Sequence, residues 1–284
     1  MTFDLPQQSL VLLVTCSMDP SRRDLAVQVV KNLADKIPDA GLSNDFILFD
    51  NASAFKDHIQ YVPHGTKIIQ SSENVGYWTA IKWVLEHALQ VMGRSYKYIY
   101  MVESDLYHTD LKPLAECEKF LDEHPDAACV RTQEFLVKQR WRFDKGLQFL
   151  PFHVTRSEIR LLNLATNKKA WFKKTSLPHI YKSNLHAKLP ALNRVEALKA
   201  VFAKLEQQGN FSEGDFFAEM VKIYPHIGVY DGGLFYSIYS REDMKTVVSG
   251  SYSGDDQLNK IGYQTTRYSC IVPVTQDPEV RIAS

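Results

Sequence analysis

Two acidic residues, one position apart, follow a short apolar run in the first half of the chain. Residues 98–102 are aromatic, β-branched or otherwise apolar, and Glu103 and Asp105 come directly after them. An unbroken apolar run of this length is typical of a strand buried on both faces of a sheet. Carboxylate oxygens are the ligands that hard divalent cations prefer. The sequence therefore predicts two cation-binding carboxylates where a buried strand ends; the alternative is a pair of solvated acids that open a loop.

Other polar residues stand where neighbouring elements are expected to begin or end. Thr15 ends the first apolar run, Asp50 and Asn51 end the second, and Asn74 and Gly76 precede a long amphipathic stretch. The carboxyl ends of parallel strands open onto one edge of a sheet, and ligands bind in the crevice outside that edge. We therefore expect these residues and the acidic pair to line a single crevice.

The residue types in this crevice suit a nucleoside diphosphate. N–H groups at a helix start near Gly76 favour a phosphate, and an ionised Asp50 can accept a hydrogen bond from a nucleobase or a ribose hydroxyl. The acidic pair would hold a cation beside the phosphates. The alternatives are structural: Asp50 and Asn51 as a turn cap, and Asn74 and Gly76 as a helix cap with a left-handed glycine.

The elements that must position these residues alternate along the first half of the chain. We predict strands over 9–16, 45–49, 67–70, 97–102 and 127–131, with helices over about 19–38, 76–92 and 111–123 between them. This order predicts an α/β fold with a mostly parallel sheet flanked by helices. The second half is less regular, with helices expected over 192–207 and 213–223 and one strand over 270–274.

Composition sets broad limits on the function. The chain has 284 residues, an apolar content of 45% and a formal net charge of zero, so the overall charge gives no reason to expect nucleic acid as a partner. Its four cysteines are scattered and form no CxxC pair, which argues against a zinc site or a disulfide framework. No apolar run near the start is long enough to span a bilayer. A soluble, cytoplasmic protein is the expectation.

Three short motifs resemble, in their order and spacing, those of the GT-A glycosyltransferases, and of the family 2 type in particular. They are Phe-Asp-Asn-Ala-Ser over residues 49–53, Asn-Val-Gly over 74–76 and Val-Glu-Ser-Asp over 102–105. The resemblance implies a single GT-A-like domain over residues 1–284. A Rossmann-like, nucleotide-sugar-binding half would cover about 9–135, and an irregular, acceptor-binding half about 136–284.

The resemblance also implies an activity and roles for individual residues. The activity is transfer of a sugar from a nucleotide-sugar donor to an acceptor hydroxyl, with Mn²⁺ or Mg²⁺ as cofactor. Asp50 would contact the nucleobase, Asp105 would hold the metal, and Glu103 would serve near the ribose or the metal. The family motif has aspartate where this chain has Glu103, whose side chain is one methylene longer.

Two further assignments come from the second half of the chain. Residues 210–217 resemble the family's helix start that carries the catalytic base, with Glu213 and Asp215 in the first turn and Asp215 slightly preferred. The alternative is that both acids only complement the helix dipole. His226 is a candidate third metal ligand or diphosphate contact; the alternative is a surface or packing residue.

Residues 138–174 are basic and aromatic. Between Arg131 and Lys174 there are eleven lysines or arginines against three acids. This stretch has three interpretations: a solvated face, a binding site for a phosphate-bearing acceptor such as a lipid-linked sugar, or a contact with the anionic inner face of a membrane.

The leading hypothesis is an inverting, metal-dependent glycosyltransferase of the hexosyltransferase type, acting in polysaccharide or glycoconjugate synthesis. Its acceptor would be a carbohydrate or a lipid-linked sugar. One alternative is a non-catalytic sugar-nucleotide-binding protein on the same scaffold. A nucleotidyltransferase is another, but such enzymes usually have a glycine-rich loop after the first strand, and residues 16–20 contain no glycine.

Overall fold

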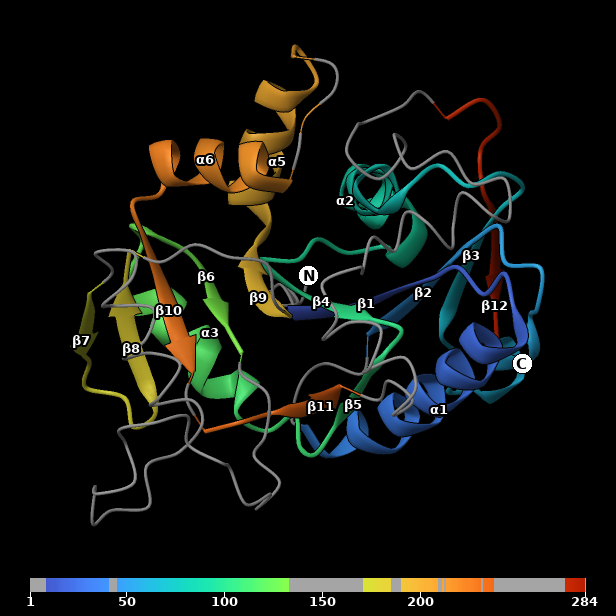
Figure 1. Ribbon diagram of the computed structural model, residues 1–284, viewed down its shortest axis with the longest axis horizontal. Coiled ribbons are helices and arrows are strands. Elements are labelled where there is room, and N and C mark those ends of the chain that lie inside the picture. Colours follow the sequence, from blue (N-terminus) through green and yellow to red (C-terminus); the bar gives the residue numbers. More distant parts are fainter. Residues whose placement is uncertain are drawn as a thin grey trace, which may run out of the picture.

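A single large sheet with helices on both faces forms the centre of the protein (Figure 1). The structure is a computed structural model, and it describes residues 9–40, 45–132, 171–184, 190–208, 211, 213–230, 232–237 and 274–283. In this part of the chain the sheet has ten strands in the order β12-β3-β2-β1-β4-β9-β6-β10-β8-β7. Helices α2, α5 and α6 cover one face, and α1 and α3 cover the other. The predicted α/β fold class is confirmed.

The first four strands are parallel, as predicted. They are β1 (Ser9–Thr15), β2 (Phe46–Asn51), β3 (Lys67–Ser71) and β4 (Tyr98–Glu103), with β1 between β2 and β4. Every residue of β1 and β2 is buried. Strands of a parallel sheet with helices on both faces are covered on both sides, which explains why their sequences are continuous apolar runs.

The helices of the first half also lie where the sequence places them. They are α1 (Pro20–Lys36), α2 (Tyr77–Met92) and α3 (Leu114–Glu123), with short 3₁₀ turns η1 (Pro38–Ala40) and η2 (Asp57–Tyr61). Asp19 begins α1 because its side chain accepts a hydrogen bond from the backbone N–H of Arg22 at 2.9 Å, and Pro20 occupies the first turn.

The second half of the sheet contains one predicted strand, β6 (Ala127–Arg131), and four that the sequence did not indicate. Those four are β7 (Phe172–Lys174), β8 (Ile180–Ser183), β9 (Ala191–Arg194) and β10 (His226–Tyr230). Strand β9 lies antiparallel between β4 and β6. The helix predicted over 192–207 was therefore wrong at its start, because α5 covers only Val195–Leu205. The helix predicted over 213–223 is confirmed as α6 (Glu213–Ile223).

The last described segment returns to the first half of the chain. Strand β12 (Glu279–Ile282) pairs antiparallel with β3 at the edge of the sheet. The strand predicted over 270–274 falls largely outside the described residues, and Val274 is not in a strand. A separate two-stranded ribbon consists of β5 (Leu106–His108) and β11 (Phe235–Ser237). No helix in the described part of the chain is both long and apolar enough to cross a membrane.

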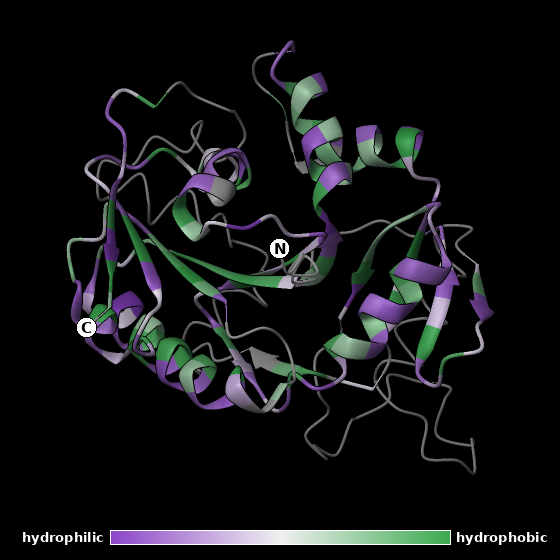
Figure 2. Ribbon diagram, turned by 180° about the vertical axis from the view of Figure 1, so that it is seen from behind, coloured by the Kyte–Doolittle hydropathy of each residue, from purple (hydrophilic) through white to green (hydrophobic). Residues whose placement is uncertain are grey.

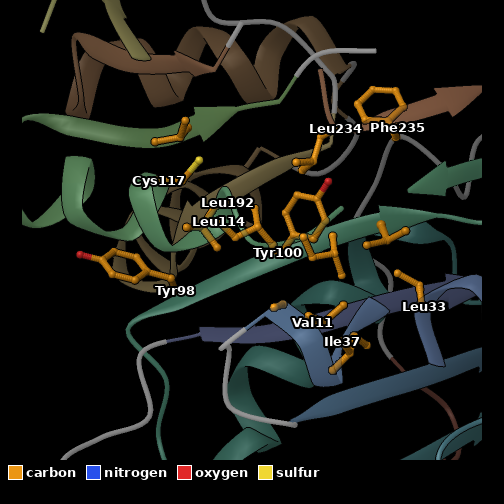
Figure 3. Close-up of a cluster of buried hydrophobic side chains, with 14 of the residues drawn as sticks. Val11, Leu33, Ile37, Tyr98, Tyr100, Leu114, Cys117, Leu192, Leu234 and Phe235 are labelled. Atoms are coloured by element: carbon orange, nitrogen blue, oxygen red, sulfur yellow. The ribbon is translucent and has the colours of Figure 1, made fainter. Parts of the chain in front are cut away.

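Two hydrophobic cores hold the helices against the sheet. The first lies between the sheet and helices α1 and α3, and Figure 3 shows Val11, Leu33, Tyr98 and Tyr100 within it. The second lies under α2, α5 and α6. Figure 2 shows hydrophobic central strands and helices that carry both hydrophobic and hydrophilic residues. Each fully buried large apolar side chain contributes about 1.5–3 kcal/mol.

A polar group is enclosed in the first core. The His108 side chain is fully buried, and its Nε2 lies 3.0 Å from the Tyr100 hydroxyl. Burial lowers the pKa of His108 to about 3 because the charged imidazolium loses its hydration. The native protein therefore keeps this histidine neutral at pH values where the unfolded chain takes up a proton.

This difference predicts a loss of stability in mild acid. As the pH falls from 7 to 5 it passes the ordinary histidine pKa of 6.5, so the unfolded state gains a proton that native His108 does not. The expected contribution of His108 to the loss is about 2 kcal/mol. Urea unfolding of His108→Gln, which does not titrate, should show a pH dependence smaller by that amount. His64→Gln, at an exposed position, is the control. The prediction would be contradicted if the free energy of unfolding had the same pH dependence in wild type, His108→Gln and His64→Gln.

Candidate functional site

The candidate site lies at the point where the strand order of the parallel half reverses. Strand β1 has β2 on one side and β4 on the other, and Val14 is in register with Glu103. The carboxyl ends of β1 and β4 therefore flank a topological switch point, and ligands of open α/β folds bind outside such points. Thr15 and the acidic pair lie at this edge, as the sequence predicted.

The acidic pair differs in exposure. Glu103 is the last residue of β4 and is partly exposed, whereas Asp105 lies in the following turn and is only 5% exposed. The Oδ1 atom of Asp105 is buried and has no hydrogen-bond partner among the described residues. A buried carboxylate oxygen without a partner is costly, and native proteins satisfy nearly all such atoms. A ligand bound at this edge would supply the partner that this oxygen lacks among the described residues.

The described residues by themselves do not form a complete metal site here. The described residues contain no group of three or more histidine, cysteine or acidic side chains that could hold a metal ion. Mg²⁺ is commonly bound through one or two carboxylates, with phosphate oxygens and water as its remaining ligands. Glu103 and Asp105 fit a cation of that kind, which a bound diphosphate would complete.

His226 does not join the acidic pair. It is the first residue of β10, in register with Ala127 at the start of β6. Both strands run in the same direction as β4, so His226 lies at the opposite edge of the sheet from Asp105. Its Nδ1 lies 2.7 Å from a carboxylate oxygen of Asp126. The metal-ligand prediction for His226 is corrected because the residues after α6 form a strand rather than a loop at the site.

Asp50 is completely buried and closes the turn that follows β2. Its Oδ1 accepts a hydrogen bond from the backbone N–H of Ser53 at 3.3 Å, across Ala52, whose φ of 59° is in the left-handed region. Its Oδ2 accepts a hydrogen bond from Gln70 Nε2 at 3.3 Å, one strand away. The turn-cap interpretation of Asp50 therefore describes this arrangement. Both carboxylate oxygens of Asp50 accept hydrogen bonds from protein groups and the side chain is completely buried, and its contact with a nucleobase stays a prediction.

Three residues that the sequence analysis missed surround Asp50. Gln70 is one. His58 Nε2 lies 3.8 Å from Asp50 Oδ1 and 3.0 Å from the Thr15 hydroxyl, and Lys56 Nζ lies 3.8 Å from Asp50 Oδ2. Burial lowers the pKa of His58, and the negative charge of Asp50 opposes that shift. Lys56 is half exposed, so it is the member of this cluster that a ligand can reach.

Strand register would have found one of the three. Gln70 is directly opposite Asp50 on β3, so correct alignment of the two runs pairs them. His58 and Lys56 come from the connection after β2, where η2 packs against α1. No periodic pattern marks such a connection, so its folding back onto Asp50 had no signal in the sequence.

The motif residues Asn51 and Asn74 fasten the start of α2 to the end of β2. Asn51 Oδ1 accepts a hydrogen bond from the backbone N–H of Val75 at 2.9 Å, and Asn51 Nδ2 donates to Asn74 Oδ1 at 2.7 Å. Asn74 Oδ1 also accepts from the N–H of Gly76 at 2.9 Å. Gly76 has a φ of +84°, which favours glycine. These contacts match the helix-cap alternative. They occupy the backbone N–H groups of Val75 and Gly76, which the sequence analysis considered as phosphate donors.

The start of α6 lies beside the start of α2. Phe216 stacks on Trp78 with ring centroids 4.2 Å apart, and both rings are buried in the second core. Asp215, one residue before Phe216, is exposed. Helix α6, which carries the predicted base, thus covers the same face of the sheet as α2 (Figure 1). The side chain of Glu213 lies outside the description.

Residues near the end of the described chain contact the loop before α2, which the sequence did not indicate. Glu73 Oε1 accepts hydrogen bonds from the backbone N–H and the hydroxyl of Thr275. Ser72 Oγ donates to Gln276 Oε1 at 3.2 Å. The loop that precedes α2 therefore contacts residues 202 to 204 positions later in the chain.

Most of the basic aromatic stretch falls outside the described residues, including 138–170. Within the described part, Trp171 is 39% exposed, and Lys173 and Lys174 are exposed on β7, the edge strand of the sheet. Exposed lysines on an edge strand are typical of a solvated edge that resists pairing with another chain.

Comparisons with known proteins give a distant likeness. No family model matches the chain, and no curated protein matches it. Solved structures that resemble it include residues 1–349 of S. aureus TarS, at 15% identity and a TM-score of 0.48, covering 81% of this chain and 60% of that one. The complex of TarS 1–349 with UDP-GlcNAc gives 14% identity and a TM-score of 0.49, with 82% and 59% coverage.

The longer TarS structure gives 15% identity and a TM-score of 0.48, and 84% of this chain covers 38% of that one. The chain thus spans about three fifths of the TarS 1–349 structures and less of the longer one. A likeness with a TM-score below 0.5 at such identity establishes neither a family nor an activity.

The link between Asn51 and the start of α2 can be tested by stability. Asn51→Ala removes the acceptor of the Val75 N–H, and Val75 is 1% exposed, so a buried donor is left unsatisfied. The expected loss in the free energy of unfolding is about 1–3 kcal/mol, measured by urea denaturation. The control is Gln60→Ala, an exposed amide bonded only to a nearby carbonyl, with an expected change within about 0.5 kcal/mol. Equal effects of the two substitutions would contradict the assigned role.

Proposed function

We propose that this protein transfers a glycosyl group from a nucleoside-diphosphate sugar to an acceptor hydroxyl, with the help of Mg²⁺ or Mn²⁺. The observation that carries the proposal is the buried Oδ1 of Asp105, which has no hydrogen-bond partner in the described part of the chain and lies with Glu103 at the switch point of the parallel sheet. Two carboxylates suit a cation whose other ligands come from a diphosphate. The motif resemblance supplies the reaction class.

Glu103 and Asp105 would hold the cation, because a buried oxygen of Asp105 has no hydrogen-bond partner among the described residues and the partly exposed Glu103 lies two residues before it, at the end of β4. A divalent cation bound there would neutralise the charge that develops on the leaving diphosphate. Thr15, Asp50 and His58 form a buried floor, joined by the 3.0 Å contact between the Thr15 hydroxyl and His58. Lys56, half exposed above this floor, is the cationic side chain available to the donor.

Asp215 is the proposed general base. Its carboxylate would take the proton of an acceptor hydroxyl while the hydroxyl oxygen bonds to the anomeric carbon. The bond between that carbon and the diphosphate oxygen breaks in the same step, and the diphosphate leaves with the electron pair. A single displacement of this kind inverts the anomeric configuration. The stacking of Phe216 on Trp78 supports the assignment because it holds this helix start next to the start of α2.

The finer parts of the proposal concern the substrates and the location. The transferred group would be a hexose, and the acceptor a carbohydrate or lipid-linked sugar in polysaccharide or glycoconjugate synthesis. The reaction would take place in the cytoplasm or at the inner face of a membrane. A non-catalytic sugar-nucleotide-binding protein is the second candidate, and the glutamate at position 103 favours it. Donor binding with Mn²⁺ but without any hydrolysis or transfer would support this candidate.

The metal assignment predicts the behaviour of Asp105→Asn. A panel of nucleotide sugars, with and without Mn²⁺, should raise the melting temperature of the wild-type protein for the correct donor only. At a hundredfold excess over Kd the stabilisation is about 2.7 kcal/mol. Asp105→Asn removes the charge at nearly constant shape, so the Mn²⁺-dependent part of this shift should disappear. Asp35→Asn, an exposed acid on α1, is the control. Unchanged donor affinity in Asp105→Asn would contradict the assignment of Asp105 as a metal ligand.

The general-base assignment predicts a separation of binding from turnover. Asp215→Asn should bind the donor found in the panel as tightly as wild type does. Its rate of donor turnover, with water or a sugar as acceptor, should fall by about 10²–10⁴-fold because proton transfer is lost. Glu219→Gln, one turn later on α6 and paired with Lys222, should retain wild-type turnover. Comparable rates for Asp215→Asn and wild type would mean that another group is the base.

A further inference from the structure

A buried asparagine in α1 is bonded to the strand that follows the acidic pair. Asn32 is 4% exposed and lies in the helix between Val29 and Leu33, which are both fully buried in the first core. Asparagine is unfavourable in a helix interior, and a buried amide is costly unless it is hydrogen-bonded. The partners of its side chain must therefore account for its presence.

Asn32 bonds both backbone groups of a single residue. Its Oδ1 accepts a hydrogen bond from the N–H of His108 at 2.6 Å, and its Nδ2 donates to the carbonyl of His108 at 2.9 Å. This is the pattern by which a neighbouring strand would pair with β5. The Asn32 side chain thus takes the place of a strand on that side of β5, across 76 positions of sequence.

The ribbon that contains β5 has few other polar links to the body of the protein. In the described part of the chain, β5 pairs only with β11, and this two-stranded sheet is separate from the ten-stranded one. A second link is the contact of 3.0 Å between His108 Nε2 and the Tyr100 hydroxyl on β4. Leu106 and Phe235 add apolar packing against the first core.

Asp105 lies within the short connection between two fixed strands. Strand β4 ends at Glu103 and β5 begins at Leu106, so only Ser104 and Asp105 intervene. The direction in which this turn presents its carboxylate depends on where β5 is held relative to β4. Asn32 holds β5 to α1. Both elements pack in the first core, on the face of the sheet that α1 and α3 cover.

We infer that Asn32 is a positioning residue for Asp105: by binding the backbone of His108 it fixes the turn that aims the unpartnered carboxylate oxygen at its cation. This inference rests on the proposed function. It assigns to a residue in the interior of helix α1 an indirect effect on the affinity of the acidic pair for a metal, exerted through β5.

The test uses Mn²⁺ alone as the probe, with free Mn²⁺ measured by electron paramagnetic resonance. Asn32→Ala should weaken the Mn²⁺ affinity at least fivefold, in the direction of Asp105→Asn, which should abolish binding. The matched control is Val30→Ala, which removes apolar atoms from a fully buried position on the same helix. It should lower the melting temperature but leave the Mn²⁺ affinity within twofold of wild type.

An unchanged Mn²⁺ affinity in folded Asn32→Ala would overturn the inference, and so would an equal loss of affinity in Val30→Ala, because the effect would then follow stability alone. If Asn32→Ala does not fold, Asn32→Ser replaces it and retains a hydroxyl that can bond one of the two backbone groups. Its expected affinity lies between those of wild type and Asp105→Asn.

A second measurement separates this inference from the proposed function. If the wild-type protein binds no Mn²⁺, the metal role of the acidic pair fails whatever Asn32 does. Amide hydrogen exchange over residues 104–106 then decides the positioning role. Faster exchange of this turn in Asn32→Ala than in Val30→Ala supports the inference, and equal exchange in the two variants overturns it.

Discussion

The burial of β4 on both faces and both edges is the constraint on which the rest of the site depends. This strand pairs in parallel with β1 and antiparallel with β9, and its residues from Tyr98 to Val102 are buried. A strand enclosed in this way has no place for a charged side chain along its length. Polar chemistry can begin only where the strand leaves the sheet, and Glu103 and Asp105 stand at that point. The switch between β1 and β4 then makes this end a crevice.

Most of the motif residues around this crevice have a structural role, because their side chains hold its loops together by hydrogen bonds. Asp50 closes its own turn, Asn51 fastens the start of α2, and Ser53 Oγ accepts a hydrogen bond from the backbone N–H of Ser17 at 2.8 Å. Asn51 thus joins the end of β2 to the start of α2, and Ser53 joins the connection after β2 to the one after β1. Hydrogen bonds within the protein therefore explain the types of these three residues. The carboxylate of Asp105 differs from them because one of its oxygens has no such bond to any residue that the structure describes.

The sequence predicted elements with long, regular patterns and failed where the signal is short or distant. Strands β1 to β4 and helices α1 to α3 are apolar runs or amphipathic periods, so their bounds were close. Residues 191–194 are too few to distinguish a strand from a helix turn, and their pairing with β4 and β6 overrides local propensity. The prediction for His226 was wrong because residues 226–230 are likewise too few to be recognised as a strand, and they form β10 by pairing with β6 and β8. His58, Lys56 and Thr275 reach the site through connections that carry no periodicity, so only the fold brings them there.

The glutamate at position 103 is consistent with where the structure places it. Glu103 still belongs to β4, whereas Asp105 lies in the turn beyond the strand. The backbone of Glu103 is therefore farther from the crevice than the backbone of Asp105. A strand advances about 3.3 Å per residue, and an added methylene extends a side chain by about 1.5 Å. The longer side chain therefore offsets part of the setback of Glu103. Since Glu103 is partly exposed and Asp105 is buried, the glutamate can adjust its rotamer to a ligand, and the aspartate depends on a turn that the protein itself must hold in place.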